Sequence, residues 1–242
     1  MPTHDPTAGR PGDLDALHRR VESIPGWLTR DQAACLAEHA TRISRGGVVV
    51  EIGSHEGRST VVLGASVPAG ARVLAIDPFP RDWRYGSSGT EQRLRANLHD
   101  AGLDKTVEVR VASSRSVLER WSGQVDLVYV DGKHDVRSTI HDIGWARHLR
   151  SGGHLLVHDS FSSIGVTVAL LLRVLPARDL RYLSRTGSLA VLERARPSWG
   201  HRVALLRQLP WWLRNIGIKV LLRLRLRALA RLAGHHDTAD PY

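Results

Sequence analysis

The stretch over residues 48–60 constrains the fold of this chain more than any other, because it combines a strand, a glycine turn and a helix start. Three successive valines at 48–50 form a β-branched run, which is typical of a parallel strand buried on both faces. Gly53 and Gly57 then bracket a short loop, and Ser59 with the small apolar residues after it continues as a helix. Such a turn leaves backbone N–H groups and a helix N-terminus at the end of the strand. The pattern therefore predicts a nucleotide-like ligand at this turn.

Further strands alternate with helical patterns along the chain. Their apolar runs lie at residues 72–76, 107–111, 125–130 and 154–157. This alternation predicts a Rossmann-like fold of the α/β class, a doubly wound and mostly parallel sheet. Two last runs, at 180–184 and 189–192, straddle a turn and predict a C-terminal hairpin that forms an antiparallel edge. Ahead of the sheet, Thr29 and Gln32 match a capping box that opens a helix.

The 242 residues divide into three expected parts. We expect an N-terminal helical segment over residues 1–45, a cofactor-binding catalytic domain over 46–195, and a basic amphipathic helical tail over 196–242. Cys35 is the single cysteine, which excludes an intrachain disulfide and favours a reducing, cytoplasmic compartment. The first residues lack the apolar core of a signal peptide, and no uninterrupted apolar run of about 18 residues predicts a spanning helix.

The positive net charge of +10 belongs to the tail. No acidic residue occurs between Glu193 and Asp237, whereas ten of the 34 basic residues lie there. The 24 basic residues that remain equal the 24 acidic residues of the chain, so the body is formally neutral.

The tail reads as one amphipathic helix. Four basic residues recur at every fourth position and would share one helical face: Lys219, Arg223, Arg227 and Arg231. Leucines occupy another face, and Trp211 and Trp212 precede the helix. This pattern favours attachment to an anionic membrane surface, which would make the protein peripheral on the inner membrane face. Packing on the body and a contact in a homo-oligomer are the alternatives. Nucleic acid is disfavoured, because stacking aromatics do not alternate with the arginines.

Polar residues follow each strand, where ligands of such sheets bind. The candidates are Glu51 with Gly53, Asp77, Ser113 with Ser114, Asp131 with His134, and His158 with Asp159. Buried strand ends do not collect carboxylates without a ligand or metal to meet them. Asp77 stands where an acidic residue would accept hydrogen bonds from both ribose hydroxyls of an adenosine. A turn cap before Pro78 is the alternative for Asp77.

Residues 51–59, E-I-G-S-H-E-G-R-S, resemble the first motif of class I S-adenosylmethionine (SAM)-dependent methyltransferases, and are most similar to catechol-type and macrolide-sugar O-methyltransferases. Further matching segments are A-I-D-P at 75–78, V-A-S-S at 111–114, D-L-V-Y-V-D-G-K-H at 126–134 and G-G-H-L-L-V-H-D at 152–159. The resemblance covers residues 45–194.

This resemblance implies roles for individual residues. Glu51 and Gly53 would face the methionine end of SAM, Ser59 would bond its carboxylate, and Asp77 would hold the ribose. Ser114 would lie near the adenine. The other residues assigned to the cofactor pocket are His55, Gly57 and Asp131.

In metal-dependent relatives, the aspartates at the positions of Asp131 and Asp159 bind Mg²⁺. The third ligand would be His158 or Ser160, which replace the usual pair at that place; a histidine would favour Mn²⁺, Fe²⁺ or Zn²⁺, and a metal-free site stays open. His134 follows Asp131 by three residues, where relatives place a catalytic lysine or histidine. We therefore predict His134 as the general base, since methyl transfer to a hydroxyl requires removal of its proton, with Asp131 and Asp159 positioning the acceptor directly or through a metal.

Two other classes of protein remain open at this point. An NAD(P)-dependent oxidoreductase could use the same sheet, although the turn is G-x-x-x-G and lacks the middle glycine of G-x-G-x-x-G. A non-catalytic membrane- or partner-binding protein could also retain the fold. For an enzyme, the expected partner is a small-molecule hydroxyl acceptor such as a sugar. Residues 81–89, with Trp83 and Tyr85, would form a lid over that acceptor.

Overall fold

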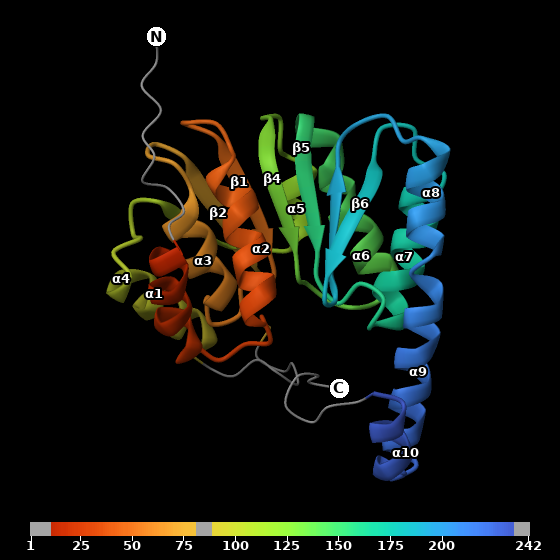
Figure 1. The fold of residues 1–242 in the computed structure, drawn as a ribbon. Coiled ribbons are helices and arrows are strands. Elements are labelled where there is room, and N and C mark those ends of the chain that lie inside the picture. Colours follow the sequence, from red (N-terminus) through yellow and green to blue (C-terminus); the bar gives the residue numbers. More distant parts are fainter. Residues whose placement is uncertain (1–10, 81–88, 235–242) are drawn as a thin grey trace.

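The structure is a computed structural model that describes residues 11–80 and 89–234. Seven strands form one sheet in the order β3-β2-β1-β4-β5-β7-β6 (Figure 1). The strands are β1 (Val48–Ile52), β2 (Arg72–Asp77), β3 (Val107–Val111), β4 (Val125–Val130), β5 (Leu149–Val157), β6 (Arg181–Thr186) and β7 (Leu189–Glu193). The helices of the body are α1 (Pro11–Glu22), α2 (Arg30–Thr41), α3 (Arg58–Ser66), α4 (Thr90–Asp100), α5 (Ser114–Leu118), α6 (Val136–Ile143) and α7 (Ile164–Val174), with a short 3₁₀ helix η1 (Gly144–His148). The predicted α/β fold is confirmed.

Strands β1 to β5 run parallel, as the alternation predicts. The C-terminal hairpin is present, but its place in the sheet differs from the expectation. Strand β7 pairs antiparallel with both β5 and β6, so the antiparallel strand lies inside the sheet and the edge strand β6 runs parallel to the others. After β5, the connection through α7 leads to β6, which lies one strand position away from β5. The tight turn at Gly187 (φ 57°) then places β7 between β5 and β6.

Two hydrophobic cores cover the two faces of the sheet. The alternating side chains of β1 show this division, since Val50 and Ile52 pack with α5, α6 and α7, while Val49 packs on the opposite face with α1 to α4. Glu51 shares its face with Val49 and is therefore directed at α3. The predicted capping box at the start of α2 is confirmed, with Thr29 and Gln32 each accepting from the other's backbone N–H.

A 3₁₀ helix follows α6, and strand β5 is longer than predicted. The helix after β4 ends at Ile143 and continues as η1 from Gly144. Strand β5 begins at Leu149, ahead of the expected start at His154. It holds Gly152 and Gly153 within a register shift against β4, and a Cβ on Gly153 would meet the carbonyl oxygen of Asp126 at 2.9 Å.

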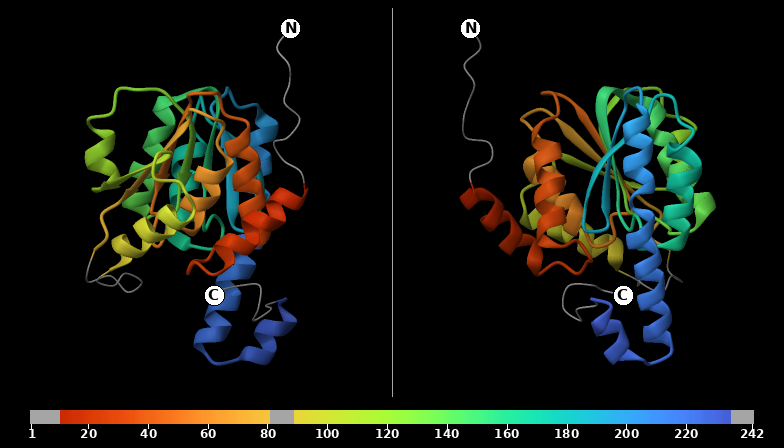
Figure 2. Two further views of the ribbon diagram at one scale, coloured as in Figure 1. Left: turned by 90° about the vertical axis from the view of Figure 1, so that its left-hand side faces the viewer. Right: turned by 45° about the vertical axis from the view of Figure 1, so that its right-hand side comes forward.

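The tail forms three helices, α8 (Trp199–Leu206), α9 (Leu209–Arg223) and α10 (Arg227–Leu232). The prediction of one continuous helix is therefore wrong, and Trp211 and Trp212 belong to the first turn of α9. Arg225 takes a left-handed φ of 59° at the break, and α10 folds back along α9. Both further views show α9 and α10 extending beyond the body (Figure 2).

Some sequence predictions fall outside the described residues. Residues 81–88 of the expected lid, with Trp83 and Tyr85, are outside the described part, and so are residues 1–10 of the N-terminal segment 1–15 that was considered for a signal peptide. Among the helices that the structure describes, none is long and apolar enough to cross a membrane.

Candidate active site

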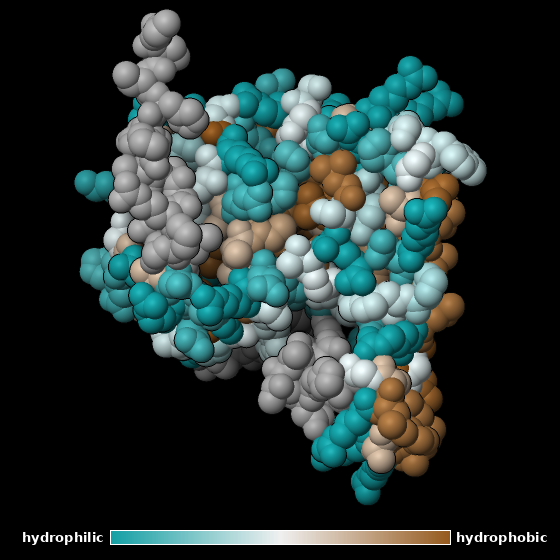
Figure 3. Space-filling model, viewed as in Figure 1, coloured by the Kyte–Doolittle hydropathy of each residue, from teal (hydrophilic) through white to brown (hydrophobic). Residues whose placement is uncertain are grey.

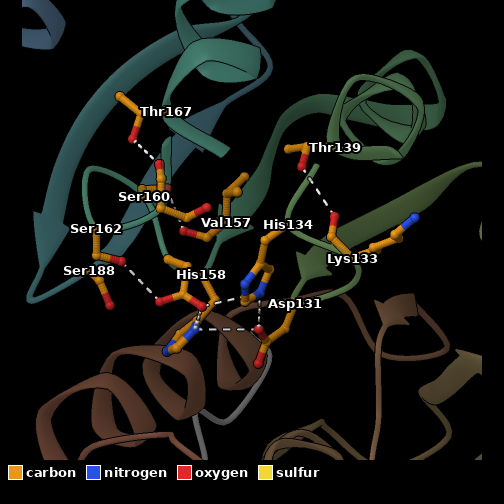
Figure 4. A network of polar contacts seen from close by, with 12 residues as sticks. Asp131, Lys133, His134, Thr139, Val157, His158, Ser160, Ser162, Thr167 and Ser188 are labelled. Carbon is orange, nitrogen blue, oxygen red and sulfur yellow. Dashed lines mark hydrogen bonds and ion pairs between the residues drawn. The ribbon is translucent and has the colours of Figure 1, made fainter. Parts of the chain in front are cut away.

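The carboxyl ends of β4 and β5 bring four titratable residues together. Asp131 and His134 follow β4, and His158 and Asp159 follow β5, as the parallel arrangement predicts. Figure 4 shows Asp131, His134 and His158 pointing toward one another. Ligand atoms of Asp131, His134 and Asp159 all lie within 4.8 Å of one another. The structure therefore assembles the predicted catalytic and metal-binding residues into one cluster.

His134 lies beside both carboxylates of the cluster. Its Nε2 is 3.1 Å from Oδ2 of Asp159 and 3.8 Å from Oδ1 of Asp131. The side chain of His134 is 43% exposed, while that of Asp159 is 5% exposed. Burial lowers the pKa of His134, but the neighbouring Asp131 and Asp159 outweigh burial, so that the pKa is raised above its ordinary value.

His158 is the buried imidazole of the cluster. Its Nδ1 lies 3.4 Å from Oδ1 of Asp131 and 3.6 Å from Oδ2 of Asp159. Burial opposes protonation of His158, but the two carboxylates raise its pKa well above the ordinary value. The pKa of Asp131 is correspondingly lowered, because the charges of His158 and His134 outweigh the cost of burying the carboxylate.

Gln32 of α2 orients His158 from the other side of the ring. The Oε1 atom of Gln32 accepts from the backbone N–H of Thr29 at 3.0 Å and lies 3.2 Å from Nε2 of His158. Since that oxygen accepts, Nε2 of His158 carries the proton and Nδ1 faces the carboxylates. Sequence reasoning found Gln32 only as a helix cap, because a contact between residues 32 and 158 leaves no local signal.

Tyr129 and Ser162 hold the two carboxylates in place. The hydroxyl of Tyr129 donates to Oδ2 of Asp131 at 3.1 Å, and the hydroxyl of Ser162 donates to Oδ1 of Asp159 at 3.0 Å. Asp159 has a left-handed φ of 54°, a conformation that aspartate tolerates better than most residues. Sequence reasoning did not assign either hydroxyl. Tyr129 lies two residues before Asp131, on the same face of β4. This spacing was the sequence signal from which the contact between the two side chains could have been predicted.

The glycine turn packs directly against the end of β4. Gly53 has φ 86°, and a Cβ there would meet the carbonyl oxygen of Asp131 at 2.2 Å. The backbone N–H groups of Ser54 and His55 both donate to Oδ2 of Asp77 at 3.0 Å. These N–H groups are therefore not free, in contrast to the expectation from the turn. The backbone N–H of Phe79 also donates to Oδ1 of Asp77 at 2.8 Å. A carboxylate offers about four acceptor positions, so about one position of Asp77 remains for a ribose hydroxyl, whereas the prediction gave it both.

Glu51 lies beneath the turn and is completely buried. It accepts from the hydroxyls of Ser59 and Thr60, each at 2.6 Å, and of Ser54 at 3.0 Å. Burial raises the pKa of Glu51 to about 7, against the opposing effect of these hydrogen bonds. The Ser59 hydroxyl, predicted to bond the methionine carboxylate, is directed at Glu51 here. Glu51 thus ties the turn to the first residues of α3.

Two further predicted pocket residues lie on either side of this centre. Ser114 begins α5, where its hydroxyl accepts from Nε1 of the buried Trp145 at 2.9 Å. Burial raises the pKa of the adjacent Asp142 to about 6.

His55 has φ 48°, and its ring lies 5.6 Å from that of Trp27. Trp27 thus adds an aromatic wall at the turn, which sequence reasoning missed because Trp27 belongs to no motif.

The cluster also fits a divalent cation. Two carboxylate oxygens and an imidazole nitrogen form a suitable donor set, and nitrogen favours Mn²⁺, Fe²⁺ or Zn²⁺ over Mg²⁺. His134 completes the tightest group, while His158, the predicted third ligand, presents Nδ1, a buried atom without a hydrogen-bond partner in the described structure. The arrangement as a whole is a Rossmann-like sheet whose carboxyl edge places the glycine turn and Asp77 beside a cluster of two carboxylates and two imidazoles.

Residues 50–160 match the family model described as a methyltransferase domain. The sheet order and the motifs at the strand ends agree with a methyltransferase domain over these residues. This match favours a methyltransferase over the oxidoreductase and over the non-catalytic protein.

Similar solved structures share the fold. A Klebsiella pneumoniae protein classed as an O-methyltransferase has a TM-score of 0.59 and 20% identity, with 78% of this chain and 92% of that chain covered. The O-methyltransferase TomG from Streptomyces achromogenes, which acts in tomaymycin synthesis and was solved with SAM, has a TM-score of 0.57 and 16% identity, over 80% and 91%. The O-methyltransferase from Bacillus cereus, solved with S-adenosylhomocysteine, has a TM-score of 0.55 and 18% identity, over 78% and 94%.

Proposed function

We propose that the enzyme transfers the methyl group of SAM to a hydroxyl of a small acceptor, a sugar or a natural-product-like molecule, with His134 as the general base. The placement of His134 carries this proposal. Its imidazole is half-exposed at the carboxyl ends of β4 and β5, next to the buried carboxylate of Asp159. The O-methyltransferase neighbours, one of them from a natural-product synthesis, support the acceptor class.

The chemistry is a displacement at the methyl carbon of the sulfonium. The acceptor oxygen forms the new C–O bond while the C–S bond breaks, and the sulfur leaves as a neutral thioether. The acceptor proton passes to Nε2 of His134, and the resulting imidazolium is stabilised by Asp159 and Asp131. His158 and Tyr129 keep the carboxylates in position and need not touch the acceptor.

A divalent cation, when bound by Asp131, Asp159 and an imidazole, would lower the pKa of the acceptor hydroxyl and fix its position. Nε2 of His134 cannot both bind a cation and accept a proton. His158 is therefore the third ligand that leaves His134 available as the base.

A labelled-methyl screen of sugars, glycosides and phenols would identify an acceptor, after which His134→Ala tests the base. We expect turnover to fall by about 10²- to 10⁴-fold, while calorimetry shows unchanged affinity for S-adenosylhomocysteine. His141→Ala on α6 is the matched control and should retain turnover. Unchanged turnover in His134→Ala would refute the role of this residue.

A further inference from the structure

The tail carries an exposed apolar strip along α8 and α9. Four of its residues recur at every seventh position and are exposed, namely Trp199, Leu206, Leu213 and Val220. Trp199 is 77% exposed to solvent and Leu213 is 62% exposed, so neither residue belongs to the hydrophobic core. Scattered exposed leucines are ordinary on a protein surface, but a strip aligned along one side of consecutive helices indicates an interaction surface.

The apolar strip continues onto the helical hairpin of α9 and α10. Leu224, Leu226, Leu229 and Leu232 are all exposed there, the last of them by 84%. Hydrophobic residues gather over the lower right of the molecule, where α9 and α10 extend beyond the body (Figure 3). The hairpin is held closed by Arg214, whose guanidinium donates to the carbonyls of Ala233 and Gly234 at 2.7 and 2.6 Å. These exposed leucines therefore belong to a defined structure that ends in a helix cap.

The charge of the tail selects among the partners that could cover this surface. Six arginines of the tail are exposed: Arg196, Arg207, Arg223, Arg225, Arg227 and Arg231. No acidic residue lies between Glu193 and Asp237. A second copy of the chain would bring two purely basic surfaces together, and like charges at an interface oppose association. A surface that is both apolar and anionic complements the tail.

We propose that α8, α9 and α10 dock the enzyme on a membrane surface that contains anionic lipid. The leucines and Trp199 would enter the interface between headgroups and acyl chains, and the arginines would contact lipid phosphates. An amphipathic element of this kind lies in the membrane plane.

The docking element is bonded to the loop that carries the active site. Asn215 of α9 donates to the carbonyl oxygen of Phe161 at 3.0 Å, and Nζ of Lys219 donates to that of Ser162 at 2.6 Å. Ser162 in turn donates to Asp159. In Figure 1, α9 and α10 also extend past the edge at which the parallel strands end. If the proposed function holds, the acceptor is therefore a membrane-attached hydroxyl compound.

Vesicle co-sedimentation of the full chain tests the docking without any acceptor, so its outcome is independent of the proposed function. The probes are vesicles of phosphatidylcholine with and without 30 mol% phosphatidylglycerol, a chosen composition. Wild type should bind the anionic vesicles and not the neutral ones. Neutralising three tail arginines (Arg223→Gln, Arg225→Gln, Arg227→Gln) should weaken partition by roughly 100-fold, since each contributes about fivefold at an anionic surface.

A matched triple on the far edge of the body (Arg110→Gln, Arg115→Gln, Arg120→Gln) removes the same charge from exposed positions and should bind like wild type. Leu213→Gln with Leu224→Gln should also weaken binding, while circular dichroism confirms that the variant is folded. Equal losses in the two arginine triples would overturn the proposal. So would a lipid-independent dimer that Leu213→Gln dissociates, or binding to RNA without binding to anionic vesicles.

Discussion

Nε2 of His134 lies 3.1 Å from Oδ2 of Asp159, although the two residues follow different strands. This contact joins a half-exposed imidazole to a buried carboxylate, and it sets the protonation of the proposed base. Burial alone would lower the pKa of His134, whereas Asp131 and Asp159 raise it. The base form of His134 is therefore populated only as the pH rises above the ordinary histidine value.

Asp159→Asn should lower the pKa of His134, because it removes one of the two charges that favour the imidazolium. An NMR titration of the imidazole in protein treated with EDTA measures this pKa without interference from a metal. We expect the wild-type pKa to lie above about 6.5 and the variant pKa to lie below the wild-type value. An identical titration in both proteins would show that Asp159 does not act on His134.

Removal of a bound cation should lower turnover if Asp131 and Asp159 hold one. We expect dialysis against EDTA to reduce methyl transfer without changing the affinity for S-adenosylhomocysteine, and Mn²⁺ to restore activity better than Mg²⁺, because nitrogen takes part in the donor set. His158→Ala and His134→Ala, compared for Mn²⁺ affinity, identify the imidazole ligand. Full activity after EDTA treatment would establish a metal-free reaction.

Glu51 should make the folded protein less stable as the pH rises. Its pKa is about 7 in the folded state, above the unfolded value, so the folded state binds the proton more tightly. The corresponding stability is fully present below about pH 4.3 and is lost as the pH rises through about 7. Between pH 5 and 8 the loss is about 2 kcal/mol.

Urea unfolding of Glu51→Gln should lack this pH dependence, since the amide does not titrate. Glu108→Gln, at an exposed position on β3, should retain the wild-type slope. If Glu51→Gln and wild type show parallel pH profiles, Glu51 is ionised at low pH in the folded protein, contrary to our interpretation.

Gly53→Ala should destabilise the protein through two effects, a left-handed φ of 86° and a clash with the carbonyl oxygen of Asp131. Gly46→Ala provides the matched control, because Gly46 has a similar φ of 72° but open space around a Cβ. We expect a loss of about 1 kcal/mol for Gly46→Ala and about 3 kcal/mol or more for Gly53→Ala. Equal losses in urea unfolding would show that the close approach to β4 costs nothing.

Much of the fold follows from local sequence patterns. The runs at 48–52 and 125–130 identify their strands because buried parallel strands are largely apolar. The edge strand at 107–111 is identified by the alternation of valines with charged residues. Thr29 and Gln32 locate the start of α2 because a capping box satisfies backbone N–H groups within one turn. The order of the strands could not be predicted as well from the sequence. The position of β7 between β5 and β6 depends on how the connection through α7 crosses the sheet.

The tail shows the same limit. A spacing of four residues from Lys219 to Arg231 predicts a continuous helix, since each step agrees with helical periodicity. The chain instead turns at Arg225 and folds back, so that Ala230 is buried and Arg214 caps the end of α10. These contacts join residues that are distant in the sequence, so the four-residue spacing of the basic residues does not predict them.

By itself, the sequence determined the α/β class, the methyltransferase motifs and the clustering of Asp131, His134 and Asp159, because parallel strands bring their carboxyl ends to one edge. Only the tertiary structure decided which groups act on one another within that edge. Gln32 orients His158, Asp77 bonds the N–H groups of the glycine turn, and the tail binds the loop after Asp159. Hydrogen bonds and ion pairs act over about 3 Å, and a separation along the chain does not reveal which side chains approach that closely.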